Sequence, residues 1–69
     1  MGLTVRVNGA EERIERSTVI ELLRARGIDP AARGVAVALN GAVVRRDHWP
    51  TTELKAGDAI EIVRPFSGG

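Results

Sequence analysis

Two Asn-Gly dipeptides constrain the fold of this 69-residue chain more than any other feature. Asn and Gly both tolerate positive φ, which the tight turn of a two-residue β-hairpin requires. The first dipeptide, Asn8-Gly9, follows a segment in which apolar and polar residues alternate, the period of a half-buried strand. The second, Asn40-Gly41, lies between two apolar segments of strand length. The sequence therefore predicts two hairpins, within residues 3–15 and 35–46.

A single short helix is predicted between the hairpins, from Thr18 to Arg26. Thr18 and Glu21 have the spacing of a capping box, and the apolar residues after Thr18 recur at helical spacing. Gly27 stands where a left-handed C-terminal cap is expected, and Pro30 prevents the helix from continuing. A lone helix can bury its apolar side only against one face of a sheet.

The last predicted strand spans residues 59–63, and Pro65 ends it because proline has no N–H to donate. The polar connection before this strand is expected to be pinned by Trp49. The resulting order is ββαβββ, and the fold class is α+β: a mixed five-stranded sheet with one main helix packed on one face. This is the layout of the β-grasp, or ubiquitin-like, fold. We expect one domain over residues 1–64 and a flexible tail over residues 65–69.

Size and composition argue against an independent enzyme. A domain this small buries only about 60% of its unfolded surface, which leaves little room for an enclosed substrate pocket. The chain has no Cys and a single His, so neither a metal site nor a catalytic triad has the residues it needs. A net charge of +1 and 3% aromatic residues disfavour nucleic-acid binding. No apolar run approaches the roughly 18 residues of a membrane span. We expect a cytoplasmic protein without a bound metal or cofactor.

The C-terminal segment offers the clearest candidate for chemistry. It ends in Phe66-Ser67-Gly68-Gly69, and the two glycines have no Cβ, so this end is thin enough to enter another protein's active site. There the carboxylate of Gly69 can attack the α-phosphate of ATP and become an acyl adenylate. A frayed chain end without a function is the alternative explanation. Phe66 has two interpretations: it packs over the sheet edge, or it anchors the tail in a partner's groove.

A docking face is expected on the side of the sheet away from the helix. Alternation along the predicted strands puts Ala36, Ala38 and Val63 on this side, where polar residues are usual. Exposed apolar patches often mark interaction sites, whereas single exposed apolar residues need no such explanation. We expect this face to meet the enzyme that activates the C-terminal carboxylate.

The C-terminal half of the chain resembles the sulfur carriers of thiamine biosynthesis, the ThiS family. The resemblance rests on residues 40–46, Trp49, residues 54–63 and Gly68-Gly69, in the arrangement NG…VV.R…W…L..GD.IEIV…GG. The N-terminal half matches in layout and in Val7-Asn8-Gly9.

The resemblance implies a carrier on which partner enzymes act, with no enzymatic activity of its own. A ubiquitin-type adenylating enzyme (ThiF/MoeB-like) would use ATP to adenylate the carboxylate of Gly69. Sulfur from a cysteine desulfurase or a rhodanese would replace the adenylate and leave a thiocarboxylate, which thiazole synthase (ThiG-like) would use. Gly68, Ser67 and Phe66 would form the part of the tail that threads into these enzymes.

Three alternatives remain open from the sequence. The first is a sulfur carrier for another pathway, such as molybdopterin synthesis, which shares the fold and the terminal diglycine. The second is a ubiquitin-like modifier that is conjugated to lysines through Gly69. The third is a β-grasp interaction module without C-terminal chemistry. A neighbouring gene for the large subunit of molybdopterin synthase, in place of one for thiazole synthase, would favour the first. Isopeptide-linked adducts in cells would reveal the second. The third predicts that a blocked C terminus leaves the function intact.

Overall fold

The computed structural model describes residues 2–65 of the chain. Its elements follow the predicted ββαβββ order, with one short 3-10 helix added before the last strand. They are β1 (Gly2–Val7), β2 (Ala10–Glu15), α1 (Val19–Ala25), β3 (Ala36–Leu39), β4 (Ala42–Val44), the 3-10 helix η1 (Arg46–His48) and β5 (Ala59–Val63). Among the described residues no helix has the length and apolar character that crossing a membrane requires.

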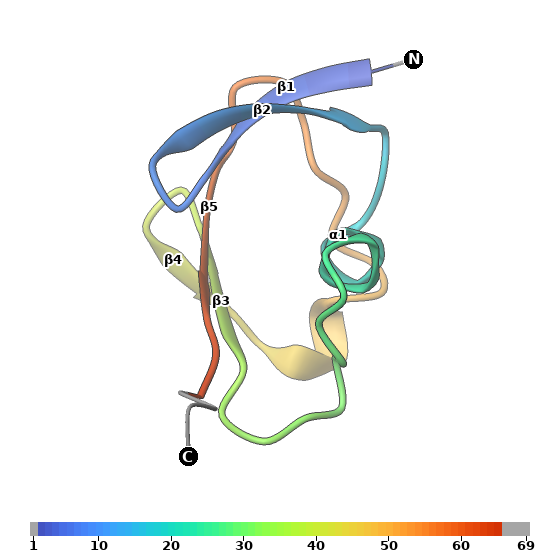
Figure 1. Ribbon diagram of the computed structural model, residues 1–69, viewed down its shortest axis with the longest axis vertical. Coiled ribbons are helices and arrows are strands. Elements are labelled where there is room, and N and C mark those ends of the chain that lie inside the picture. The colour runs from blue at the N-terminus through green and yellow to red at the C-terminus, as the bar shows by residue number, and fades with distance from the viewer. Residues whose placement is uncertain (1, 66–69) are drawn as a thin grey trace.

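The five strands form one mixed sheet in the order β2-β1-β5-β3-β4. Each hairpin pairs its own two strands antiparallel, and β5 joins the hairpins by pairing parallel to β1 and antiparallel to β3. The last strand in the sequence is therefore the central strand of the sheet. Helix α1 lies across one face of the sheet (Figure 1). This arrangement confirms the predicted α+β, β-grasp fold.

Both predicted hairpin turns are present, and their asparagines also hold the central strand. Asn8-Gly9 and Asn40-Gly41 have positive φ at all four positions, as a two-residue hairpin turn requires. The side-chain Oδ1 of Asn8 accepts a hydrogen bond from the N–H of Ile62 at 2.8 Å. Likewise, Oδ1 of Asn40 accepts from the N–H of Ala59 at 2.9 Å. The two turns therefore fasten β5 from both of its neighbouring strands.

The predicted helix signals are confirmed. The N–H of Glu21 donates to the Thr18 hydroxyl at 3.3 Å, and the Glu21 carboxylate accepts from the N–H of Thr18 at 2.8 Å, which completes the capping box. Gly27 has φ of +76°, the conformation of a left-handed cap.

The core lies between α1 and the sheet. Its buried residues are Val5, Val7, Val19, Leu22, Leu23, Ile28, Val35, Val37, Trp49, Leu54, Ile60 and Ile62. Trp49 is fully buried and donates its indole N–H to the carbonyl of Val44 at 2.9 Å, so the long connection before β5 is pinned as predicted.

The fourth strand differs from the prediction. A return strand over residues 42–46 was expected, but β4 ends at Val44 and the 3-10 helix begins at Arg46. The side chain of Arg46 explains the difference, because it turns toward the loop between α1 and β3 and lies over the Trp49 ring, 4.8 Å from the ring centroid. Its guanidinium donates to the carbonyls of Pro30, Ala32 and Val35. These contacts are incompatible with an extended strand through Arg46.

Candidate functional site

The C-terminal segment leaves the fold from the centre of the sheet. Strand β5 ends at Val63, which pairs with Ala36 of β3, and Pro65 is the last described residue. A Cβ built on Gly34 would lie only 3.2 Å from the Pro65 ring, so the ring packs closely over this glycine. Gly34 also has φ of +83°, which a larger residue rarely adopts. The start of the predicted tail is therefore held against the loop before β3.

The predicted tail residues themselves lie beyond this point. Phe66, Ser67, Gly68 and Gly69 are outside the described residues, so their roles and the flexibility of the tail stay predictions. The structure does define the end of β5 and the two residues after it, Arg64 and Pro65, which precede these four residues in the chain.

The predicted docking residues are together on the sheet face away from α1. Ala36 and Val63 are direct cross-strand partners, and Val63 is 62% exposed. Ala38 is half-buried on the same face and pairs with Val43 of β4. Val43 is 79% exposed, the larger exposure of the two exposed large hydrophobic residues among those described. We call Ala36, Ala38, Val43 and Val63 the apolar face.

Val43 is the member that sequence reasoning missed. The signal was present, because Val43 alternates with the half-buried Val44 and stands two residues from the turn glycine Gly41. Once the hairpin register is known, Val43 must share a face with Ala38, its partner across the ladder. The Asn40-Gly41 turn predicts the register of the second hairpin, but that register was not used to assign the residues of the return strand to a face.

Charged residues border the apolar face on the same side of the sheet. Glu61 lies between the buried Ile60 and Ile62, and it pairs with Ala38. Arg6 lies on β1, beyond β5, and is exposed. The face is therefore apolar over β3, β4 and the end of β5, and charged toward β1, which is the pattern of an apolar interface core with a polar rim.

The side chains with acid–base chemistry do not form a catalytic cluster among residues 2–65. His48 is exposed in η1, and the neighbouring Asp47 carboxylate pairs with Arg45 at 3.5 Å. No group of three or more His, Cys, Asp or Glu side chains in this part of the chain could hold a metal ion. The described residues thus offer a surface and a chain exit in place of a reaction centre.

Fold and site together define a β-grasp protein in which the central, C-terminal strand runs beside an exposed apolar face. Comparison with protein-family models identifies the family: the ThiS family model matches residues 5–69. The chain therefore belongs to the ThiS family.

Solved structures agree with this assignment. The chain is similar to the crystal structure of thiamine biosynthesis protein ThiS from Geobacter metallireducens, with 36% identity and a TM-score of 0.79 over 97% of this chain and 100% of that one. It is also similar to the NMR solution structure of a thiamine biosynthesis protein from the same organism, with 36% identity and a TM-score of 0.80 over 97% of this chain and 88% of that one. A comparison with curated protein sequences found no match.

Proposed function

We propose that this protein is a sulfur carrier and that its working group is the C-terminal carboxylate of Gly69. The observation that supports the proposal most directly is the ThiS family match, which extends through Gly68-Gly69 to the end of the chain. The two similar structures, both of thiamine biosynthesis proteins, favour thiamine as the pathway.

In the proposed mechanism the carrier supplies the carboxylate and its partners supply the catalysis. On a ubiquitin-type adenylating enzyme, the Gly69 carboxylate attacks the α-phosphate of ATP and releases pyrophosphate, which gives an acyl adenylate. The outer sulfur of a persulfide on a cysteine desulfurase or a rhodanese-like donor then attacks the adenylate and displaces AMP, which gives an acyl disulfide. A thiol attacks the donor's sulfur in this bond, forms a disulfide with it and releases the thiocarboxylate. Thiazole synthase takes up this sulfur. Gly68 keeps the approach narrow, and the reactions are expected to take place in the cytoplasm.

The apolar face is proposed as the surface that docks the adenylating enzyme. Val63 belongs both to this face and to the strand that leads to the C terminus. The six residues that follow Val63, ending at Gly69, span at most about 22 Å when extended. An enzyme that covers the apolar face therefore needs its adenylating site within that distance of Val63. Binding of the apolar face then places the carboxylate in the adenylating site at the same time.

Intact mass spectrometry tests the carrier role. The protein is incubated with a candidate adenylating enzyme, ATP and a sulfur donor, and a mass gain equal to replacing one oxygen by sulfur is expected. Deletion of Gly69 should abolish the gain. An unchanged mass with several adenylating enzymes, under conditions that convert a known ThiS protein, would contradict the proposal.

The docking role is tested by introducing one charge into the apolar face. Ala38→Asp is expected to raise the KM of the adenylating enzyme for the carrier by about tenfold or more, because an unpaired carboxylate would be buried in the interface. Ala25→Asp is the matched control, since Ala25 is an exposed residue of α1 on the opposite side of the sheet. Equal KM values for the two folded variants would refute docking through Ala38.

The sulfur acceptor is tested separately. Once the thiocarboxylate form is in hand, it is offered to thiazole synthase and to the large subunit of molybdopterin synthase. Sulfur transfer to the first alone is expected, and transfer to the second would move the carrier to molybdopterin synthesis.

A further inference from the structure

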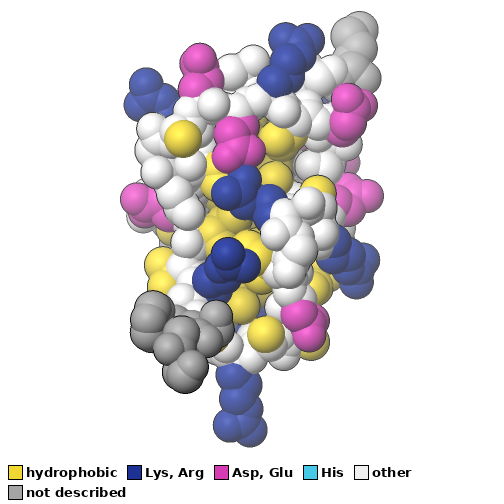
Figure 2. Space-filling view, in the orientation of Figure 1, with side chains coloured by type: hydrophobic (Ala, Val, Ile, Leu, Met, Phe, Trp, Pro, Cys, Tyr) yellow, Lys and Arg dark blue, Asp and Glu magenta, His cyan; other side chains and the backbone are white. Residues whose placement is uncertain are grey.

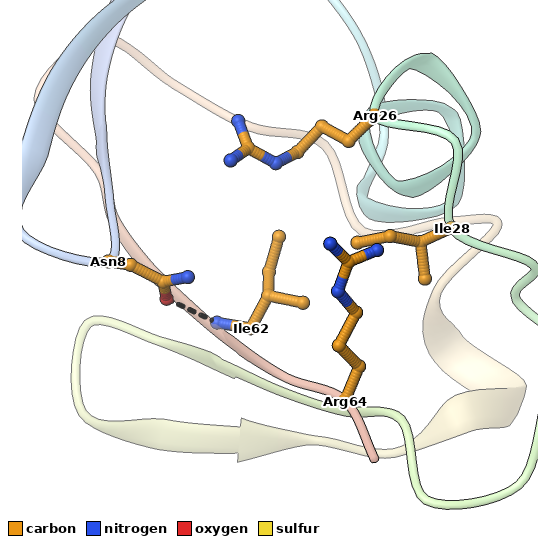
Figure 3. Close-up of a pocket in the computed structure, with 5 residues that line it drawn as sticks. All are labelled: Asn8, Arg26, Ile28, Ile62 and Arg64. Atoms are coloured by element: carbon orange, nitrogen blue, oxygen red, sulfur yellow. Dashed lines mark hydrogen bonds between the residues drawn. The ribbon is translucent and has the colours of Figure 1, made fainter. Parts of the chain in front are cut away.

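A groove with basic walls lies apart from the apolar face, between the C-terminal end of α1 and the end of β5 (Figure 3). Its first part is a hollow of about 300 Å³ lined by Asn8, Arg26, Ile28, Ile62 and Arg64. Ile28 and Ile62, only 7% and 8% exposed, form an apolar floor. Arg26 from the helix side and Arg64 from the strand side extend into the same space (Figure 3). Figure 2 shows hydrophobic side chains in the space between sheet and helix with Lys or Arg side chains lying across them.

The polar side chains of this hollow present hydrogen-bond donors. Oδ1 of Asn8 is occupied by the N–H of Ile62, which leaves the amide Nδ2 to donate. Arginine has five N–H donors and no acceptor. Nη1 of Arg26 donates to both carboxylate oxygens of Glu12, at 2.8 and 2.9 Å. Within residues 2–65 no carboxylate forms an ion pair with Arg64. Among residues 2–65, the hollow therefore has one positive charge without a carboxylate partner and an excess of donors.

The groove continues past Arg64 to the point where the chain leaves the described fold. A second hollow of about 290 Å³ shares Ile28 and Arg64 with the first and extends to Val35 and Pro65. Its one carboxylate, Asp29, accepts a hydrogen bond from the N–H of Ala31 at 2.9 Å and keeps its negative charge, but within residues 2–65 it forms no ion pair with Arg64. We call the two hollows together the Arg64 groove. It has a donor-rich half and an apolar half, and Arg64 stands between them.

We propose that the Arg64 groove binds an acidic side chain, Glu or Asp, of a protein partner, with an apolar neighbour of that residue on Ile28 and Val35. A carboxylate matches the fork of the guanidinium and the amide donor of Asn8. The groove is open, and the Arg26 side chain is 34% exposed, so a free anion would keep much of its water. A protein that also covers the apolar half excludes this water and strengthens the ion pair.

The location identifies the kind of partner. An enzyme that encloses the chain end comes close to Pro65 and Arg64, because they connect β5 to the terminal residues. On the proposed carrier function, on which this step rests, the partner is the adenylating enzyme. The groove is then a second contact, distinct from the apolar face, that orients the outgoing chain.

Peptide titration tests the groove without reference to the function. The ¹⁵N-labelled protein is titrated with acetyl-Leu-Glu-Leu-amide, with the Gln analogue and with sodium acetate at constant ionic strength. The Glu peptide is expected to shift the backbone N–H of Ile28 and the side-chain Nε–H of Arg64. Arg64→Gln should abolish the shifts and Arg24→Gln, an exposed helix arginine outside the groove, should preserve them. Equal shifts with the Gln peptide, or no shifts, would overturn the proposal, and equal shifts with acetate would reduce the groove to a site for free anions.

Enzyme kinetics test the same groove in the proposed function. Arg64→Glu is expected to raise the KM of the adenylating enzyme for the carrier by about tenfold or more, because one partner of a desolvated charge pair is lost. Arg24→Glu changes the net charge of the carrier by the same amount, and its KM is expected to stay within about twofold of the wild-type value. If both variants behave alike while the wild-type protein is converted, the groove proposal is wrong and the carrier function stands. If the wild-type protein is not converted, the carrier function fails, and the peptide titration alone decides the groove. Arg26 is left unchanged because it holds Glu12.

Discussion

Arg46 is expected to be the exposed residue on which the stability of this small fold depends most. Its guanidinium donates to three carbonyls in the loop between α1 and β3, one of them at 2.9 Å and one at 3.4 Å, and lies 4.8 Å from the Trp49 ring centroid. The hydrogen bonds to Pro30 and Ala32 contribute roughly 1 kcal/mol each and the cation–π contact about 0.5–1 kcal/mol, while the 3.4 Å contact with Val35 is too long to add much. Arg46→Ala should therefore lower the free energy of unfolding by about 2–3 kcal/mol.

For a domain of this size the loss corresponds to a fall in Tm of roughly 10–20 °C. The measurement is urea and thermal unfolding, followed by circular dichroism and by the fluorescence of the single tryptophan, Trp49. Arg46→Lys keeps the charge but replaces the planar fork with a single ammonium, so it should recover less than half of the lost stability.

The neighbouring Arg45 provides a matched control. Its side chain is 80% exposed, and its only ion pair within residues 2–65 is the 3.5 Å contact with Asp47. Arg45→Ala is expected to change the free energy of unfolding by less than about 0.5 kcal/mol. If Arg46→Ala is no more destabilising than Arg45→Ala, or if Arg46→Lys matches the wild type, the loop is not held by the guanidinium and the reasoning fails.

Three further predictions concern the core, the helix and the first turn. Leu23 is 0% exposed, so Leu23→Ala should cost about 2–5 kcal/mol by urea unfolding; a cost near zero would show that the site collapses around the smaller residue. Thr18→Ala removes the N-cap and should cost about 1 kcal/mol, whereas Glu21→Gln, which keeps the capping box, should cost much less; equal losses would argue against the box. Asn8→Ala loses the bond to Ile62 and replaces asparagine by a residue that adopts φ of +52° less readily, for about 2 kcal/mol in all. Asn8→Gly loses the bond alone and should cost about half as much, and identical costs would show that the backbone conformation does not contribute.

Most of the fold was predictable because its signals are local. An Asn-Gly turn and a capping box depend on residues that are neighbours in the sequence, so both hairpin turns, the helix and its two ends were predicted correctly. The register of each hairpin follows from its turn. Alternation along each strand assigned Ala36, Ala38 and Val63 to one face before the structure was known.

The errors occurred where a distant residue overrides a local pattern. Residues 42–46 look like a strand, yet Arg46 leaves the strand direction to bind carbonyls 11 to 16 positions earlier in the chain. Val43 was missed for a different reason, because the register of the second hairpin was not extended to the return strand. The chemistry assigned to Gly69 came from the sequence and the family resemblance, and it stays a prediction because it falls outside the described residues.

The sequence by itself determined the order of the elements, the two turns, the faces of the strands and the family, because each depends on short-range geometry or on the residue pattern itself. Only the tertiary structure decided that β5 lies at the centre of the sheet, with Asn8 bound to Ile62 across 54 positions. It also decided that Arg26 and Arg64 share one groove. These features arise when segments far apart in the chain are packed around one core, and no local preference encodes which distant partner a side chain will meet.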